Sequence, residues 1–141
     1  MVKYLDLKKI NDSFEPELSE AVARVVRSGW YLFGKEVETF EQRFAHYCGT
    51  GYCVGTGNGL DALTLIFMAY VSMGRMKVGD EVIVPANTYI ASILAVMRAG
   101  LKPVFCEPEW DTCNIDPGKV ENLISVRTKA VMVVHLYGRV C

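Results

Sequence analysis

Short apolar segments alternate with helical segments through residues 52–134, and this alternation constrains the fold more than any other feature of the sequence. The apolar segments are almost entirely hydrophobic, which is typical of buried strands; they cover residues 52–56, 81–84, 103–106 and 130–134. Between them, apolar residues recur at helical spacing in residues 60–73, 89–99 and 116–125. Strands that are buried on both faces and joined by helices form a parallel sheet. The sequence therefore predicts an α/β fold, with a mainly parallel sheet and helices on both faces.

The first 50 residues have a different pattern. Residues 1–13 are expected to be an extended lead-in. A helix is predicted from Glu15 to Ser28, with Gly29 as the residue that ends it, and a second helix from Glu36 to Tyr47. An aromatic loop, Trp30–Gly34, lies between the two.

The composition is that of a soluble globular domain. Of the 141 residues, 51% are hydrophobic and 22% are charged, and the net charge is −1. The fifteen lysine and arginine residues are scattered, so no basic surface is expected to follow a nucleic acid backbone. Every apolar stretch is interrupted before it could span a membrane, and residues 1–9 lack the apolar run of a signal peptide. We expect neither a nucleic acid nor a membrane partner.

Five cysteines, an odd number, include no Cys-x-x-Cys pair. Cys53 and Cys106 fall inside predicted buried strands, where a thiol behaves as a small hydrophobic group. The two histidines, His46 and His135, are far apart and lack metal-ligand spacing. We therefore expect reduced thiols in a cytoplasmic protein and no metal site. No catalytic thiol is predicted.

Three glycines, Gly55, Gly57 and Gly59, separate the first predicted strand from the next helix. They leave the backbone bare where the helix begins, and the first turn of a helix has N–H groups without intrahelical partners. Such a turn can hold a phosphate. Similar turns also occur in folds that bind no ligand there, so both interpretations stay open at this point.

Tyr89 follows the second predicted strand, in the loop that starts the next helix. Ligands of open parallel sheets lie beyond the carboxyl ends of the strands, so Tyr89 could offer its ring to a flat ligand held near Gly59. The alternative is that Tyr89 packs on the sheet, and that Asn87 and Thr88 only cap the helix.

Two kinds of cofactor suit a phosphate-binding turn in such a sheet. A dinucleotide site needs Gly-x-Gly-x-x-Gly and an acidic residue at the end of the second strand. Here the spacing is Gly55-x-Gly57-x-Gly59, and the second strand ends in Pro85-Ala86-Asn87. The pattern argues against NAD and favours a phosphorylated aromatic cofactor, a description that fits pyridoxal phosphate.

Several motifs match one family in order and spacing: residues 28–41, 58–63, 79–89, 114–117, 128–130 and 134–138. Over its whole length the chain resembles the amino-terminal part of the DegT/DnrJ/StrS family of pyridoxal-phosphate sugar aminotransferases. It is similar to the subgroup that aminates nucleotide-linked deoxysugars, because Asn58-Gly-Leu60 stands where many relatives carry Ser-Gly-Thr.

This resemblance implies that residues 1–141 are the amino-terminal part of a large domain of fold type I that binds pyridoxal 5′-phosphate. The rest of that domain and a small carboxyl-terminal domain would be absent. The intact protein would be a homodimer that transfers an amino group from glutamate to a nucleotide-linked keto-deoxysugar.

The resemblance also assigns roles to residues. The backbone amides of Gly59 and Leu60, with Asn58 beside them, would hold the cofactor phosphate, and Tyr89 would stack on the pyridine ring. Trp30 and Tyr31 would contact the substrate near the dimer interface, or alternatively only pack on the surface.

No catalytic residue is assigned within the chain, because the family's cofactor-bonding lysine and the carboxylate at the pyridine nitrogen follow the His135–Gly138 motif. None of the eight lysines has a matching context. We expect a truncated chain that is inactive alone. The alternatives are a pyridoxal-phosphate sugar dehydratase of the same family, or a non-catalytic dimerisation or binding module.

Overall fold

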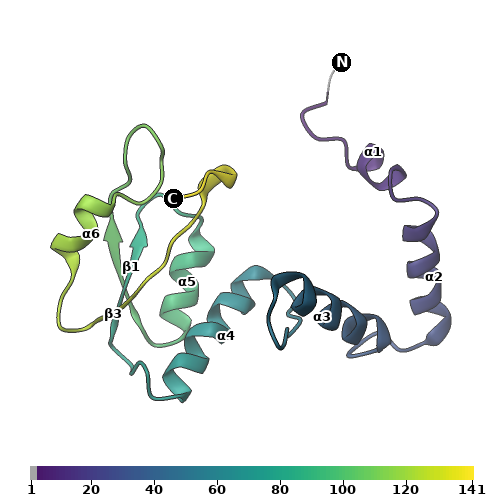
Figure 1. Cartoon of the computed structure of the whole chain (residues 1–141), viewed down its shortest axis with the longest axis horizontal. Helices are drawn as coiled ribbons and strands as arrows, with labels where there is room; N and C mark the ends of the chain where they lie inside the picture. The colour runs from purple at the N-terminus through teal and green to yellow at the C-terminus, as the bar shows by residue number, and fades with distance from the viewer. Residues whose placement is uncertain (1–2) are drawn as a thin grey trace. The chain divides into compact units, whose positions relative to one another are not determined.

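The computed structural model describes residues 3–141 (Figure 1). The chain forms two compact units that divide between Gly55 and Thr56. The second unit contains a sheet of three parallel strands in the order β2-β1-β3. These strands are β1 (Glu81–Pro85), β2 (Lys102–Cys106) and β3 (Thr128–Val131). Every residue of the central strand β1 is buried, as expected for a strand that is paired on both edges and covered on both faces.

Helices cover both faces of this sheet (Figure 1). Helices α4 (Gly59–Ser72) and α5 (Ile90–Arg98) pack on one face, where Val82 and Val84 contribute to the core. Helix α6 (Pro117–Leu123) packs on the other face, against Ile83 of β1. Alternate residues of a strand point to opposite faces, so β1 supplies both cores. The predicted α/β fold is confirmed.

Local signals placed the start of α6 and the character of Cys106 correctly. Asp116 is the N-cap of α6, and its Oδ1 accepts a hydrogen bond from the Gly118 amide at 2.9 Å. Cys106 is fully buried, and this burial raises the pKa of its thiol, as expected for a structural cysteine. All five cysteines are free.

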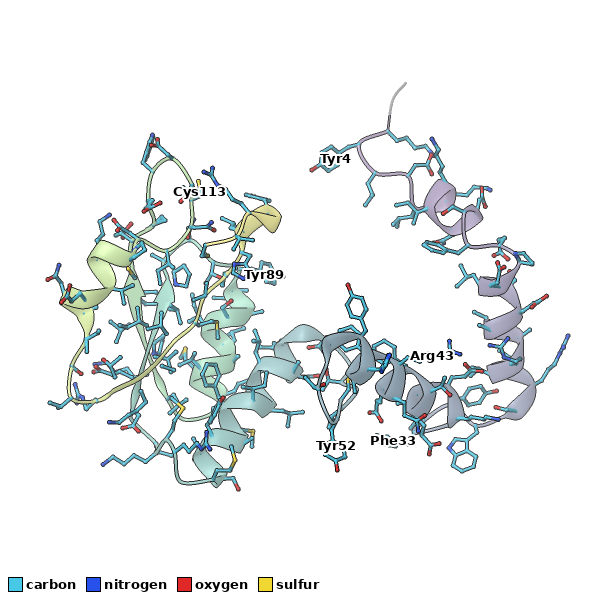
Figure 2. All side chains as sticks on the ribbon, in the orientation of Figure 1. Tyr4, Phe33, Arg43, Tyr52, Tyr89 and Cys113 are labelled. Atoms are coloured by element: carbon cyan, nitrogen blue, oxygen red, sulfur yellow. The ribbon has the colours of Figure 1, made fainter. Side chains whose placement is uncertain are left out.

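The prediction of a strand at residues 52–56 is wrong. This segment has no ladder partner among residues 3–141, and Tyr52 is 92% exposed and projects away from the ribbon (Figure 2). Its polar groups bond within the first unit instead. The Gly55 amide donates to Oε1 of Glu41 at 2.6 Å, and the Thr50 hydroxyl donates to the Tyr52 carbonyl at 3.0 Å. Cys53 is therefore only half-buried and lies outside any strand.

The last strand is also displaced from its predicted position, since β3 covers residues 128–131 rather than 130–134. The Met132 amide still donates to the Ile83 carbonyl, at 2.8 Å, but β1 offers no further pairing beyond this point. The chain then leaves the sheet and forms a short 3₁₀ helix, η1 (Leu136–Gly138).

Within residues 3–55, the first unit contains three helices, α1 (Leu7–Asp12), α2 (Glu17–Ser28) and α3 (Lys35–Cys48). Helix α1 corrects the expected extended lead-in: Asp6 caps it by accepting a hydrogen bond from the Lys9 amide at 3.2 Å. Residues 1 and 2 of that expected segment lie outside the described residues. Helices α2 and α3 are confirmed, and Gly29 ends α2 in the left-handed conformation at φ +67°.

The first unit buries little. Among its described residues only Ala45 is buried, and the apolar faces of α2 and α3 are exposed. Of the helices in residues 3–141, none has the length and apolar character needed to cross a bilayer.

Candidate active site

The glycine turn predicted to bind phosphate forms the amino terminus of α4. Asn58 is the N-cap: its Oδ1 accepts a hydrogen bond from the Asp61 amide at 2.9 Å, and its Nδ2 donates to the Asp61 carboxylate at 2.9 Å. The side chain of Asn58 is therefore occupied by the helix itself. It orients the turn and leaves anion binding to the backbone.

The amides of Gly59 and Leu60 have no acceptor among residues 3–141. A Cβ placed on Gly59 would meet no atom within 4 Å, so the surface at Gly59 itself is open. Neither Gly59 nor its neighbours Gly55 and Gly57 has a positive φ, so the bare surface, rather than a left-handed backbone, is what glycine contributes here. The Leu60 side chain is partly buried and packs against the core on the α4 and α5 face of the sheet.

One carboxylate lies next to this turn. Asp61, in the first turn of α4, is 3.8 Å from Nη1 of Arg98 in the last turn of α5. Both side chains are about half exposed, so solvent weakens the pair. The Arg98 charge nevertheless offsets the Asp61 charge beside the helix terminus, where a dianion would otherwise be repelled.

Tyr89 is the N-cap residue of α5, and its side chain is 78% exposed (Figure 2). The alternative that Tyr89 packs on the sheet is therefore wrong, and its ring is free to stack on a ligand. Asn87 and Thr88 do not cap α5. The Asn87 Nδ2 donates to the Cys113 carbonyl at 2.8 Å, and the Thr88 hydroxyl bonds to the Ser92 hydroxyl at 2.8 Å.

Tyr89 and the Asn58–Leu60 turn share no hydrogen bond or ring contact among residues 3–141. The Asp61–Arg98 pair joins the turn to the carboxyl end of α5, whereas Tyr89 begins that helix. A helix of nine residues rises about 13 Å. A joint role of Tyr89 and the turn therefore requires a ligand that reaches both.

Trp30 and Tyr31 line a cavity of about 490 Å³ inside the first unit. The carboxyl end of α2 and the first turn of α3 form its walls. Trp30 is 67% exposed. Its Nε1 donates a hydrogen bond to the Leu32 carbonyl at 2.6 Å, and this bond holds the ring against its own loop. A concave site with aromatic walls is typical of small-ligand binding.

Two cations in this cavity were not identified from the sequence. Arg24 of α2 and Lys35 of α3 both line it, and Nε of Arg24 is 3.1 Å from the Glu36 carboxylate. Arg24 and Ser28 are four residues apart on α2, a spacing that could have indicated a shared helix face. No group of three or more histidine, cysteine or acidic side chains in the described part of the chain could hold a metal ion.

A family model of the DegT/DnrJ/EryC1/StrS aminotransferase family matches residues 12–141. The chain belongs to this family. It is 56% identical to the dTDP-3-amino-3,6-dideoxy-α-D-galactopyranose transaminase of Aneurinibacillus thermoaerophilus. The match covers all 141 residues of this chain and 38% of that transaminase.

Two solved structures of family members share this fold. DesV from S. venezuelae is 47% identical and superposes with a TM-score of 0.88, over 99% of this chain and 37% of DesV. A sugar aminotransferase from Streptococcus pneumoniae in its PLP form is 35% identical, with a TM-score of 0.78 over 90% of this chain and 31% of that protein. These neighbours belong to fold type I, which confirms the fold class. The chain spans less than two fifths of the length of these relatives.

Proposed function

We propose that the protein containing residues 1–141 transfers an amino group from glutamate to a nucleotide-linked keto-deoxysugar, with pyridoxal 5′-phosphate as its cofactor. The observation that carries this proposal is the 56% identity, over the whole chain, to a transaminase named for a dTDP-linked amino sugar. The free cysteines and the absence of a bilayer-spanning helix in residues 3–141 are compatible with a cytoplasmic enzyme.

The α4 turn fits the phosphate of this cofactor. The amides of Gly59 and Leu60 are unpaired among residues 3–141, Gly59 is exposed, and both amides lie at the positive end of the α4 dipole. Asn58 holds the turn in place through its two bonds to Asp61. We assign phosphate binding to the two amides and positioning to Asn58.

Tyr89 fits the aromatic part of the cofactor, because its exposed ring can stack on a pyridine ring. When bound, pyridoxal phosphate supplies the carbonyl group and the electron-withdrawing ring on which an amino group is carried between donor and acceptor. Tyr89 would orient that ring, and Gly59 and Leu60 would fix its phosphate end, once the rest of the large domain brings the α4 turn and the start of α5 within reach of one cofactor.

We assign the substrate to the cavity that contains Trp30 and Tyr31. Their rings suit a nucleotide base or a sugar face, and Lys35 and Arg24 offer positive charge for phosphate oxygens. Arg24 already pairs with Glu36, so Lys35 is the more available cation. The exposed apolar faces of α2 and α3 support a homodimer, since apolar surface of this kind is commonly covered in an assembly.

Chemistry of this kind also needs a lysine that bonds the cofactor and a carboxylate at the pyridine nitrogen. None of the eight lysines lies in the α4 turn or in the loop that precedes α5. We therefore infer that these groups lie outside residues 1–141, in the rest of the large domain, and that the chain is inactive by itself.

Incubation of the intact protein with glutamate, pyridoxal phosphate and a dTDP-linked keto-deoxysugar tests this function. Mass spectrometry of the sugar nucleotide should show that an amino group replaces the keto oxygen, with one 2-oxoglutarate formed for each amino sugar. The 141-residue chain alone should give no product above the background of the free cofactor. Loss of a hydroxyl group from the sugar without amination would establish the dehydratase alternative instead. If the intact protein produces neither product, the chain belongs to a non-catalytic module.

A further inference from the structure

Asn114 is a buried polar residue in the loop between β2 and α6, and it is 4% exposed. Both ends of its side-chain amide form hydrogen bonds to distant backbone groups. Oδ1 accepts a hydrogen bond from the Leu136 amide at 3.2 Å, and Nδ2 donates to the Arg139 carbonyl at 3.1 Å. These partners are 22 and 25 residues away in the sequence. A buried amide with both ends paired to distant backbone fixes that backbone, because leaving either end unpaired is costly.

The loop that carries Asn114 is itself well fixed. Pro108 and Ile115 form an antiparallel bridge, and the Glu109 amide donates to the Asn114 carbonyl at 2.9 Å. The Thr112 hydroxyl accepts a hydrogen bond from the Asn114 amide at 3.1 Å. Asn114 therefore acts from a rigid base rather than from a mobile loop.

The two bonds of Asn114 bracket Tyr137, which lies between Leu136 and Arg139. Tyr137 has a left-handed backbone, with φ +52°, and its side chain is 97% exposed. A side chain other than glycine is strained in this conformation, so the surrounding structure must hold it there. The exposed Tyr137 ring does not hold it there by packing, so the backbone depends on the hydrogen bonds on either side of Tyr137. These are the two bonds to Asn114 and the bonds of the turn itself, in which the Gly138 amide donates to the His135 carbonyl at 3.0 Å and the Arg139 amide to the Leu136 carbonyl at 3.1 Å.

All of these groups lie in loops that leave the carboxyl ends of the parallel strands. Tyr137 follows β3, Asn114 follows β2, and Asn87, which follows β1, ties this region to the first loop through the Cys113 carbonyl. In sheets of this kind, ligands bind beyond these ends. The direction in which Tyr137 leaves the sheet is therefore relevant to any ligand bound there.

We propose that Asn114 is a positioning residue that holds Tyr137 in its left-handed conformation beyond the carboxyl end of the sheet. This role follows from the bonds of the chain itself and does not depend on the proposed aminotransferase activity.

Nuclear magnetic resonance of the 141-residue chain tests this role, with wild type compared with Asn114→Leu, which keeps the size of the side chain and removes both bonds. The Leu136 amide also donates to the Val134 carbonyl at 3.0 Å, and this bond remains in Asn114→Leu. Loss of the second acceptor should still accelerate hydrogen exchange at the Leu136 amide, on the order of tenfold. The three-bond coupling between the amide and α protons of Tyr137, which reports φ, should change. Exchange in β1 should stay as in wild type. Asn122→Leu is the matched control, because Asn122 is exposed and its side chain forms no hydrogen bond among residues 3–141.

Asn114→Asp tests the same role of Asn114 if Asn114→Leu does not fold. It keeps the acceptor for the Leu136 amide and removes the donor to the Arg139 carbonyl. Slow exchange at Leu136 should therefore persist while the Arg139 carbonyl resonance shifts. An unchanged Tyr137 coupling and Leu136 exchange rate in Asn114→Leu, or no Arg139 shift in Asn114→Asp, would overturn the proposal. So would equal acceleration of exchange in β1, which would make Asn114 a general core residue.

Discussion

At the residue scale, Glu81 joins the amino ends of the three strands. Its carboxylate is buried at the start of β1, where Oε2 accepts a hydrogen bond from the Ser125 hydroxyl at 2.6 Å. Oε1 is 2.9 Å from Nη2 of Arg127 and 3.5 Å from Nζ of Lys102. The Ser125 hydroxyl, and then the Arg127 charge, hold the pKa of Glu81 below its usual value of 4.5, although burial opposes them.

This lowered pKa gives stability a defined pH dependence. As the pH falls, the unfolded chain takes up a proton at Glu81 before the folded chain does, so the contribution of Glu81 is present above about pH 4.5 and is lost below it. We expect Glu81→Gln to lower the free energy of unfolding at pH 7 and to reduce its decline between pH 4.5 and pH 3. Urea unfolding across this range measures both effects. Glu121→Gln, at an exposed position of α6, is the control and should follow the wild-type pH curve.

Features of the candidate site could be predicted from the sequence where they depend only on residues that are adjacent along the chain. Asn58 and Gly59 precede an apolar helical face, so the cap and the bare turn could be read from neighbouring residues. The positions of Arg98 beside Asp61 and of Arg24 beside Trp30 could not be predicted from the sequence, because each depends on how the chain packs. The hydrogen bond from Asn87 to the Cys113 carbonyl joins two loops that are 26 residues apart, so it could not be predicted from local sequence either.

At the element scale, the sequence predicted best those helices and strands that carry their own boundary signals. Helix α2 ends at Gly29, and α6 begins after Asp116. The segment at residues 52–56 has the apolar character of a strand, but a strand forms only where another chain segment pairs with it. That partner cannot be read from the segment itself. The short helix α1 has only two apolar residues, Leu7 and Ile10, and buries neither, so the Asp6 cap is its clearest signal in the sequence.

The cap of α4 gives a prediction at this scale. Asn58→Ala removes the acceptor for the Asp61 amide and should lower the free energy of unfolding by about 1 kcal/mol. Asn58→Ser keeps a capping oxygen and should lose less. Chemical denaturation of the three proteins measures the difference. Equal stability of Asn58→Ala and wild type would show that Asn58 does not hold the α4 turn.

At the scale of the whole molecule, the two units differ in where apolar side chains are buried. The second unit buries its core around β1, whereas Ala45 is the one buried residue among those described in the first unit. Stability measured on the chain should therefore reside mainly in residues 56–141.

A matched pair of phenylalanines tests this distribution. Phe67 of α4 is buried in the core, while Phe40 of α3 is largely exposed. Phe67→Ala should lower the free energy of unfolding by about 3–5 kcal/mol, and Phe40→Ala should cost far less. Denaturant unfolding followed by far-ultraviolet circular dichroism measures both. Similar losses for the two substitutions would indicate that α3 is as firmly packed as α4.

The central claim is that the bare amides at the start of α4 bind phosphate, and titration of the ¹⁵N-labelled chain with inorganic phosphate and with pyridoxal 5′-phosphate tests it most directly. Wild type should show saturable shifts at the Gly59 and Leu60 amides. Gly59→Val should abolish binding, because a branched side chain beside the Gly59 and Leu60 amides would crowd a phosphate oxygen, whereas the added Cβ itself meets no protein atom within 4 Å. Gly51→Val, which also has open space around the added Cβ, is the control and should bind as wild type does. Equal affinity in wild type and Gly59→Val, or phosphate-dependent shifts confined to other residues, would contradict the account.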